Sequence, residues 1–506
     1  MNRVLKSLQS GLCLGAILAP LAASMLISCS RQRETEFFTG RVDFPVQPTL
    51  GVKEAMAARL IPHPRQLEWQ KLEMTAFIHF TINTFTDMEW GTGKESPALF
   101  NPVSLDAEQW VRVLSEAGMK MVIITAKHHD GFCLWPTKTT THSVASSPWK
   151  DGKGDVIREL KEACDKYNMK FGVYLSPWDR NAECYGDSPA YNRFYMEQLT
   201  ELLTWYGKVD EVWFDGANGE GPDGRRQEYD WQAYYDLIRK LQPDAVTAIM
   251  GEDVRWVGTE SGYGRETEWS ATVLAPGGKP ESVTINQTLG VNAMSEDLGS
   301  SSLLHKADHL FWYPAEVDVS IRPGWFWHAS QDSLVKDVAK LADIYLSSVG
   351  RNAVLLLNVL PDSRGLITDH DIQSLQGMKA WIDKLYSKDF LNGSRPYGRG
   401  ASNLTDGDNR TSWSPRRKQV ASFVPAIAAT FNVAMLQEDI SRGQRVEKFI
   451  IEALSGTRWD TVATGTTIGY KRLIRFPEVK ADEIRLTIVS SRATPYISTF
   501  ALYHAE

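Results

Sequence analysis

Short apolar segments alternate with amphipathic segments through most of the first 390 residues, and this alternation constrains the fold more than any other feature. Apolar runs of this length, separated by helices, are typical of buried parallel strands in βα units. The runs are MTAFIHF (74–80), MVIITAKH (121–128), FGVYLSPW (171–178), VDEVWFDG (209–216), AVTAIMG (245–251), DHLFWYPA (308–315) and NAVLLLNVL (352–360).

The segments between these runs have helical periodicity. In 106–117, Trp110, Val113, Leu114 and Ala117 share one face, and a glycine follows where the helix should end. We expect further helices over 156–167, 191–206, 230–241, 333–348 and 371–386. The strand ends recur at roughly 40 to 50 residues, which favours an α/β fold of the (β/α)8 TIM-like type over a doubly wound sheet. Catalytic groups of such barrels lie at the carboxyl ends of the strands.

The ends of the chain differ in character from this region. Arg3 and Lys6 precede an apolar stretch that is too short for a confident membrane span. The following LISC, residues 26–29, resembles a bacterial lipobox, which implies cleavage before Cys29 and lipidation of that cysteine. An ordinary secretory signal with an incidental cysteine is the alternative. We therefore expect an envelope protein, periplasmic or associated with the outer membrane, that contacts the membrane only through its lipid anchor.

From about residue 399 the chain shows short alternating segments such as EIRLTIV, which predict an antiparallel sandwich. SNLTDGDNRTSW and GTTIGYKRLIRF resemble discoidin-like sandwiches. The acidic turn Asp406 to Asp408 is interpreted either as a structural Ca²⁺ site or as a plain turn. We favour a domain that buttresses the barrel over one that binds sugar. The expected organisation is a signal peptide (1–28), a tether (29–50), the barrel (51–393) and the sandwich (394–506).

Composition narrows the classes of partner. The net charge of -7 disfavours nucleic acid as a partner, since phosphate binding needs a basic face. Three scattered cysteines beyond the expected lipobox, Cys133, Cys164 and Cys184, form neither a disulfide framework nor a zinc site. The 17 tryptophans suit sugar rings as well as a core.

Polar and aromatic side chains occur where four of the predicted strands end. These residues are His79, His128, His129, Tyr174, Trp213 and Asp215. The adjacent histidines lack a further ligand at metal-binding spacing, so we expect no metal in this site and imidazoles that bind hydroxyl groups. Asp215 is either a turn former or a nucleophile, and a glycosidase would need a second carboxyl group. Glu252, Asp253, Glu260, Glu266 and Glu268 are candidates, and spacing does not choose among them.

Several motifs together resemble the α-L-fucosidases of glycoside hydrolase family 29. They are FIHFTINTFTDMEWGTGKESPALFNP, TAKHHDGFCLWPTKTTTHSV, YLSPWDRN, EVWFDGANGEGP, RWVGTESGY, SIRPGWFWH and GRNAVLLLNVLPDSRGLI. The resemblance implies Asp215 as the nucleophile and Glu260 as the acid/base. The WVGTE and RPGWFWH motifs resemble the subgroup that acts on α-1,3- and α-1,4-linked fucose.

The same resemblance implies which residues contact the sugar. His79, His128, His129, Tyr174 and Trp213 match the fucose-contacting positions, Trp90 is expected to face the methyl group of the sugar, and Trp325 lies in the RPGWFWH motif. Thr81 and Thr259 depart from residues that are common in the family. We expect an exo-acting, retaining enzyme without a cofactor that acts on fucosylated oligosaccharides or glycoconjugates. A retaining glycosidase for a galactose-configured sugar and a non-catalytic glycan-binding lipoprotein are the alternatives.

Overall fold

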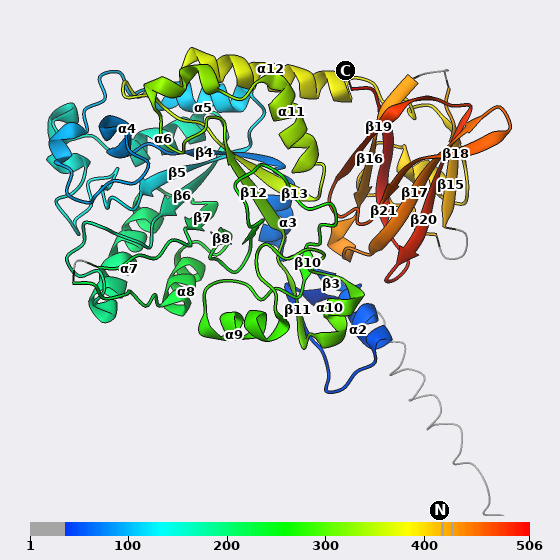
Figure 1. Cartoon of the computed structure of the whole chain (residues 1–506), viewed down its shortest axis with the longest axis horizontal. Coiled ribbons are helices and arrows are strands. Elements are labelled where there is room, and N and C mark those ends of the chain that lie inside the picture. Colours follow the sequence, from blue (N-terminus) through cyan, green and yellow to red (C-terminus); the bar gives the residue numbers. More distant parts are fainter. Residues whose placement is uncertain (1–35, 222, 416–418, 427–429, 506) are drawn as a thin grey trace, which may run out of the picture.

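An eight-stranded parallel sheet organises the larger part of the molecule, and two antiparallel sheets form the C-terminal part (Figure 1). The computed structural model describes residues 36–221, 223–415, 419–426 and 430–505. The predicted signal sequence and Cys29 lie outside these residues. The fold class predicted from the sequence, a TIM-like barrel followed by antiparallel sheets, is confirmed.

The parallel strands form a nearly closed barrel. They pair in the order β8-β7-β6-β5-β4-β13-β12-β9. The backbone N–H of Val254 donates to the carbonyl of Thr247 at 3.1 Å, so the two end strands lie next to each other. Their bounds are β4 (Met74–Ile78), β5 (Met121–Lys127), β6 (Lys170–Leu175), β7 (Glu211–Phe214), β8 (Val246–Ile249), β9 (Arg255–Trp256), β12 (Ala315–Ser320) and β13 (Ala353–Asn358).

One predicted barrel strand was wrong. The segment 308–315 contains β11 (His309–Trp312), which pairs antiparallel with β10 (Ala271–Thr272) and β2 (Arg41–Asp43) in a small separate sheet. The barrel uses β12 and the two-residue strand β9 instead. The hydrophobic pattern does not predict β12 because its inward positions are acidic, whereas a buried strand is expected to be apolar.

Helices cover the outside of the barrel (Figure 1). Five of them begin after an aspartate whose side chain accepts a hydrogen bond from the backbone of the first turn, which satisfies a free N–H group. The expected helix 333–348 begins only after such a cap, Asp337. The helices are α2 (Leu50–Ala57), α3 (Pro64–Gln70), α4 (Asn83–Thr86), α5 (Ala107–Glu116), α6 (Val156–Lys166), α7 (Ser188–Trp205), α8 (Trp231–Leu241), α9 (Pro280–Leu289), α10 (Ser301–Lys306), α11 (Val338–Ser347) and α12 (Asp369–Tyr386). Two short strands, β1 (Phe38–Thr39) and β3 (Leu60–Ile61), pair near the start of the described chain.

The C-terminal part contains two antiparallel sheets with a shared apolar core. The predicted alternation is confirmed, because Ile484, Leu486 and Ile488 are buried while Arg485 and Thr487 are half-buried. One sheet has the order β14 (Arg395–Tyr397), β15 (Val420–Val424), β20 (Glu483–Ser491), β17 (Val446–Ser455), β18 (Arg458–Gly465), and the other has the order β19 (Arg472–Lys480), β16 (Thr430–Glu438), β21 (Ile497–Tyr503).

Hydrogen bonds join the sandwich to the barrel. The backbone N–H of Asn352 donates to the carbonyl of Lys471 at 2.9 Å, and that of Leu473 donates to Gly350 at 2.8 Å. The Gln444 side-chain amide accepts from the backbone N–H of Ser270 at 2.7 Å and donates to the backbone carbonyl of Glu268 at 3.0 Å, just before β10. These contacts fit the buttress interpretation, which stays a prediction.

The acidic turn of the sandwich is closed by its own residues. Asp406 accepts from Thr411 Oγ1 at 2.7 Å, and Asp408 accepts from Nε and Nη2 of Arg410, both at 2.8 Å. These hydrogen bonds lower the pKa of Asp408 to about 2. In the described part of the chain, no three His, Cys, Asp or Glu side chains are grouped to hold a metal ion, and no helix is long and apolar enough to span a membrane.

Candidate active site

Asp215 follows the last residue of β7 and lies on the same side of the chain as Trp213. Its Oδ1 accepts from the backbone N–H of Ala217 at 2.7 Å, and its Oδ2 accepts from the Tyr174 hydroxyl at 3.0 Å. The Tyr174 and Trp213 rings stack with centroids 5.2 Å apart. Trp213 Nε1 in turn donates to Glu316 at 2.7 Å. The carboxylate is therefore held by groups from two neighbouring strands and its own turn.

Three histidines at the ends of β4 and β5 lie beside this carboxylate. His79 Nδ1 bonds Asn358 at 3.0 Å, and His129 Nδ1 bonds Ser176 Oγ at 2.7 Å with Nε2 3.8 Å from Asp215. The His128 and His129 ring centroids are 4.1 Å apart. Burial lowers the pKa of all three, that of His79 to about 3. Each ring is thus neutral at neutral pH and offers one N–H donor and one nitrogen acceptor.

Glu260 lies on the exposed loop after β9, opposite the strand ends just described. Trp325 Nε1 donates to its Oε2 at 3.0 Å. Asp215 and Glu260 line one pocket of about 540 Å³, which continues past Trp256 to α9 and residues 291–293. The pocket therefore extends from both carboxyl groups to α9 and the loop that follows it.

The other acids near Glu260 have partners elsewhere. Glu252 pairs with Lys279, Asp253 with Arg65 and Arg239, Glu266 with Arg351 and Arg472, and Glu268 with Arg255. Among the described residues, Glu260 is the one of the five candidates that lines the pocket together with Asp215. The structure thus separates candidates that sequence spacing left equivalent.

The remaining predicted site residues lie at the rim. Trp90 is 58% exposed, and its ring meets His129 edge-on at 5.6 Å. The Trp325 and His79 ring centroids are 5.1 Å apart, and the backbone N–H of Trp325 donates to Glu89 at 2.8 Å. All the residues expected to contact sugar are therefore gathered around one end of the barrel, with Trp90 as the exposed member.

The sequence analysis missed several polar residues of this site. Asn358 and Ser176 fix two of the histidines, and Trp256 Nε1 donates to Asp318 Oδ1 at 2.8 Å. Burial, together with the nearby charges of Glu260 and Asp215, raises the pKa of Asp318 to about 7. The alternating acids of AEVDVS (315–320) could have indicated Asp318 from the sequence, because burying a carboxyl group inside a barrel costs free energy unless the group has a partner or a function.

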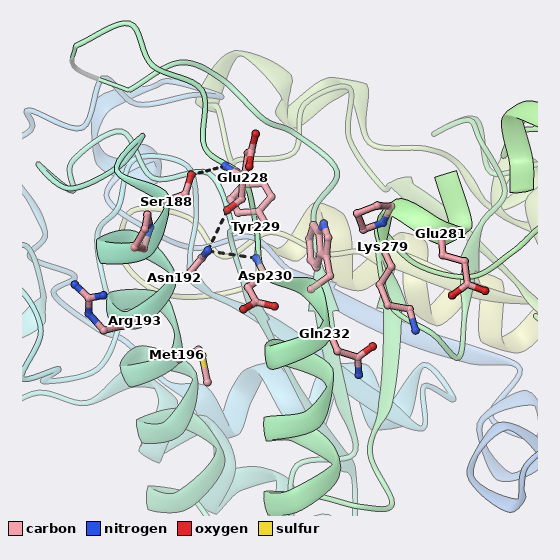
Figure 2. A pocket seen from close by; sticks show the side chains of 13 residues that line it. Ser188, Asn192, Arg193, Met196, Glu228, Tyr229, Asp230, Gln232, Lys279 and Glu281 are labelled. Carbon is pink, nitrogen blue, oxygen red and sulfur yellow. Dashed lines mark hydrogen bonds between the residues drawn. The ribbon is translucent and has the colours of Figure 1, made fainter. Parts of the chain in front are cut away.

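A larger hollow of about 750 Å³ lies on the outer surface of the barrel between α7, α8 and the start of α9 (Figure 2). In it, Asn192 Nδ2 donates to the backbone carbonyl of Glu228 at 3.0 Å, and Ser188 Oγ accepts from the Glu228 N–H at 2.9 Å. Its lining residues do not include Asp215, Glu260 or any histidine of the site. Size alone therefore does not mark the reactive pocket.

Two carboxyl groups at the carboxyl ends of barrel strands, flanked by neutral imidazoles and aromatic rings, define the site of a glycoside hydrolase. The family model for alpha-L-fucosidase matches residues 61–386, which is more than half of the chain. The chain therefore belongs to the alpha-L-fucosidase family, glycoside hydrolase family 29, and is an α-L-fucosidase.

Individual relatives agree with this assignment. Alpha-L-fucosidase 1 of Arabidopsis thaliana is 42% identical over 462 residues, which cover 88% of this chain and 87% of that protein. The crystal structure described as a putative alpha-L-fucosidase from Bacteroides ovatus has 58% sequence identity and a TM-score of 0.88. The match covers 93% of this chain and 78% of that chain. A Ruminococcus gnavus family 29 fucosidase in complex with fucose is 30% identical with a TM-score of 0.78, covering 88% and 95%.

Proposed function

We propose that this enzyme removes terminal α-1,3- and α-1,4-linked L-fucose from branched glycans and glycoconjugates, with retention of configuration. The observation that carries the linkage proposal is the pocket of about 540 Å³ that leads from Asp215 and Glu260 to α9. A volume in this range accommodates ligands larger than one sugar. A branched glycan presents two substituents beside the fucose, and this wide side of the pocket would receive them.

In the proposed mechanism Asp215 attacks the anomeric carbon while Glu260 protonates the leaving oxygen. Glu260 then deprotonates the water that hydrolyses the covalent fucosyl-enzyme intermediate. Retaining enzymes hold the two carboxyl groups ~5 to 5.5 Å apart in the productive complex. The Tyr174 hydroxyl at 3.0 Å orients Asp215 and supports its role as a fixed nucleophile.

The other site residues bind the sugar in this proposal. His79, His128 and His129 are neutral and buried, so they suit hydrogen bonds to ring hydroxyls better than acid/base chemistry. Trp213 lines the pocket and Trp325 lies beside His79, so we expect both indoles to contact the sugar, and the exposed Trp90 would cover the methyl group of fucose. We propose that no cofactor takes part.

The test is hydrolysis of a panel of fucosylated oligosaccharides followed by proton NMR of the released sugar. We expect α-L-fucose as the first-formed anomer, rapid release from α-1,3/1,4-linked branched trisaccharides, and slow release from an unbranched α-1,2-linked trisaccharide. Equal rates on both linkage types would contradict the linkage proposal. Release of β-fucose first would contradict retention, and release of galactose would favour the galactose-configured alternative.

We also propose that the mature protein is anchored in the bacterial envelope by lipid on Cys29. The support is the LISC sequence alone, which follows a basic and apolar segment. Replacement of Cys29 by serine should move the protein from the membrane fraction to the soluble fraction. Membrane association that survives this replacement would contradict lipidation at Cys29.

A further inference from the structure

A third carboxyl group, Asp318, lines the same pocket as Asp215 and Glu260. It lies on β12, where Glu316, Asp318 and Ser320 face the barrel interior at alternate positions. The residue is 4% exposed, although it borders an open pocket. A carboxyl group in this place is costly unless it has a function or a partner.

Among the described residues, one oxygen of Asp318 accepts a hydrogen bond from another side chain and the other does not. Oδ1 accepts from Trp256 Nε1 at 2.8 Å, which holds the Trp256 ring against the pocket. Across the described residues, Oδ2 accepts no hydrogen bond from another side chain and Asp318 belongs to no ion pair. The Oδ2 atom is therefore the one available to a ligand in the pocket.

The groups around Asp318 are acidic or apolar. Glu260 after β9 and Asp215 at the end of β7 both raise the pKa of Asp318 electrostatically. Asp318 in turn raises the pKa of Glu316, two residues earlier on β12. On β9, Arg255 also lines the pocket, but its guanidinium pairs with Glu268. On β13 the register partner is Leu356. Among the residues that the structure describes, no cation is a cause that favours the ionised form of Asp318.

Burial and this acidic neighbourhood raise the pKa of Asp318 to about 7. Below that pH the group carries a proton, and its O–H is a hydrogen-bond donor beside the two catalytic carboxyl groups. Above that pH it adds a negative charge next to Asp215, which repels the nucleophile's own charge in a poorly solvated site.

We propose that Asp318 is a further catalytic residue, which donates a hydrogen bond from Oδ2 to an oxygen atom of the bound substrate near the scissile bond while Oδ1 fixes Trp256. The inference rests on the proposed roles of Asp215 and Glu260, but not on the linkage preference. It makes the site a set of three carboxyl groups, of which one acts as a neutral donor.

The test compares Asp318→Asn, Asp318→Ala and Trp256→Phe by the pH profile of kcat/KM on an activated aryl α-L-fucoside. For the wild type we expect kcat/KM to fall as the pH rises through about 7. Asparagine accepts from Trp256 through its oxygen and donates through its amide, without titrating. Asp318→Asn should therefore retain kcat/KM within about threefold at pH 5 and move the alkaline limb to higher pH. Asp318→Ala should lose about tenfold or more.

Two outcomes would overturn the inference. The first is an Asp318→Asn profile whose alkaline limb is unchanged. The second is an Asp318→Asn loss at pH 5 as deep as that of Asp318→Ala with unchanged thermal stability, because the carboxyl group would then accept rather than donate. Trp256→Phe removes the donor to Oδ1, whose hydrogen bond lowers the pKa of Asp318, so we expect its alkaline limb to persist but to shift to higher pH.

The aryl substrate separates this inference from the linkage proposal. A wild type that cleaves the aryl fucoside but not branched trisaccharides would contradict the linkage preference and leave Asp318 testable. If Asp318→Ala fails to fold, the pH profile of Asp318→Asn still decides.

Discussion

The two sides of the active site are built differently. Asp215 stands at the end of a buried strand and is held by Tyr174 and the backbone of Ala217. Glu260 is exposed on a loop and is held by Trp325, which lies on another loop. The nucleophile side is thus part of the barrel, whereas the acid/base side depends on contacts between loops.

This difference has a chemical reason. A nucleophile must attack from a fixed position, and strand ends in a barrel are rigid. The acid/base group must exchange a leaving sugar for water, so access from solvent is useful on its side. The loops are nevertheless tied: Glu89 accepts from the Trp325 N–H at 2.8 Å and from His328 at 2.7 Å. Changes on the strand side should therefore abolish catalysis, and changes on the loop side should reduce it in graded steps.

The largest effect is expected for Asp215→Gly. Loss of the nucleophile should reduce kcat/KM by on the order of 10⁴-fold, because the covalent intermediate no longer forms. Azide, which can occupy the vacated space, should restore part of the turnover of an activated aryl fucoside. Asp223→Gly on the same loop is the control, since Asp223 pairs with Arg225 at the surface. Turnover of Asp215→Gly near the wild-type rate would show that Asp215 is not the nucleophile.

A smaller and selective effect is expected for Glu260→Ala. On a natural glycan kcat/KM should fall by about 10² to 10⁴-fold, because the leaving oxygen is no longer protonated. On an aryl fucoside with a good leaving group the loss should be far smaller, and steady-state kinetics on both substrates measure the difference. Glu266→Ala, whose partners are Arg351 and Arg472, serves as the control. Equal losses of Glu260→Ala on both substrates would assign the acid to another residue.

Trp325→Phe should have an intermediate effect that reports on the loop contact alone. It removes the hydrogen bond to Glu260, so we expect kcat/KM on glycans to fall about fivefold to tenfold. Trp327→Phe is a matched control on the same loop, because Trp327 Nε1 has no hydrogen-bond partner among the described residues. Identical kinetics of the two variants would mean that Trp325 does not position Glu260 through its indole N–H.

The smallest effect concerns the pH dependence of the loop contact. Burial opposes the charge of His328, but hydrogen bonds to Asp87 and Glu89 raise its pKa above the usual range. A raised pKa gives stabilisation that is complete below the unfolded pKa of about 6.5 and is lost as the pH rises through the folded value. His328→Gln should therefore lower the Tm by roughly 1–2 °C at pH 5.5 and by less at pH 9.

Thermal unfolding across that pH range measures this effect. His305→Gln, at an exposed position of α10, should leave the pH dependence of the Tm as in the wild type. A His328→Gln variant with the wild-type pH dependence would show that protonation of His328 does not hold the loops together.

The strand side could be predicted in detail from the sequence. Its strands are apolar runs that end in polar residues, so both β4 to β7 and the residues His79, His128, Tyr174 and Asp215 follow from local patterns. Their helices begin at aspartate caps that are equally local. Local patterns do not show which oxygen or nitrogen each side chain bonds, because Asn358 and Ser176 come from other strands.

The loop side could not be predicted in this way. Strand β9 has two residues, and β12 carries inward acids, so neither resembles a buried strand. Five acids occur between residues 252 and 268. The four other than Glu260 pair with cations, and Arg65 and Arg472 among these come from distant segments. The pairing of Trp325 with Glu260 likewise joins two loops far apart in the sequence.

The sequence by itself therefore determined the barrel, the antiparallel C-terminal sheets and the nucleophile candidate, because hydrophobic periodicity, caps and strand-end polarity act over a few residues. Only the tertiary structure decided which carboxyl group shares a pocket with Asp215, and that Asp318 lies beside them. The reason is physical: burial and charge pairing depend on which segments the barrel brings together, and they change the chemistry of residues that the sequence presents as equivalent.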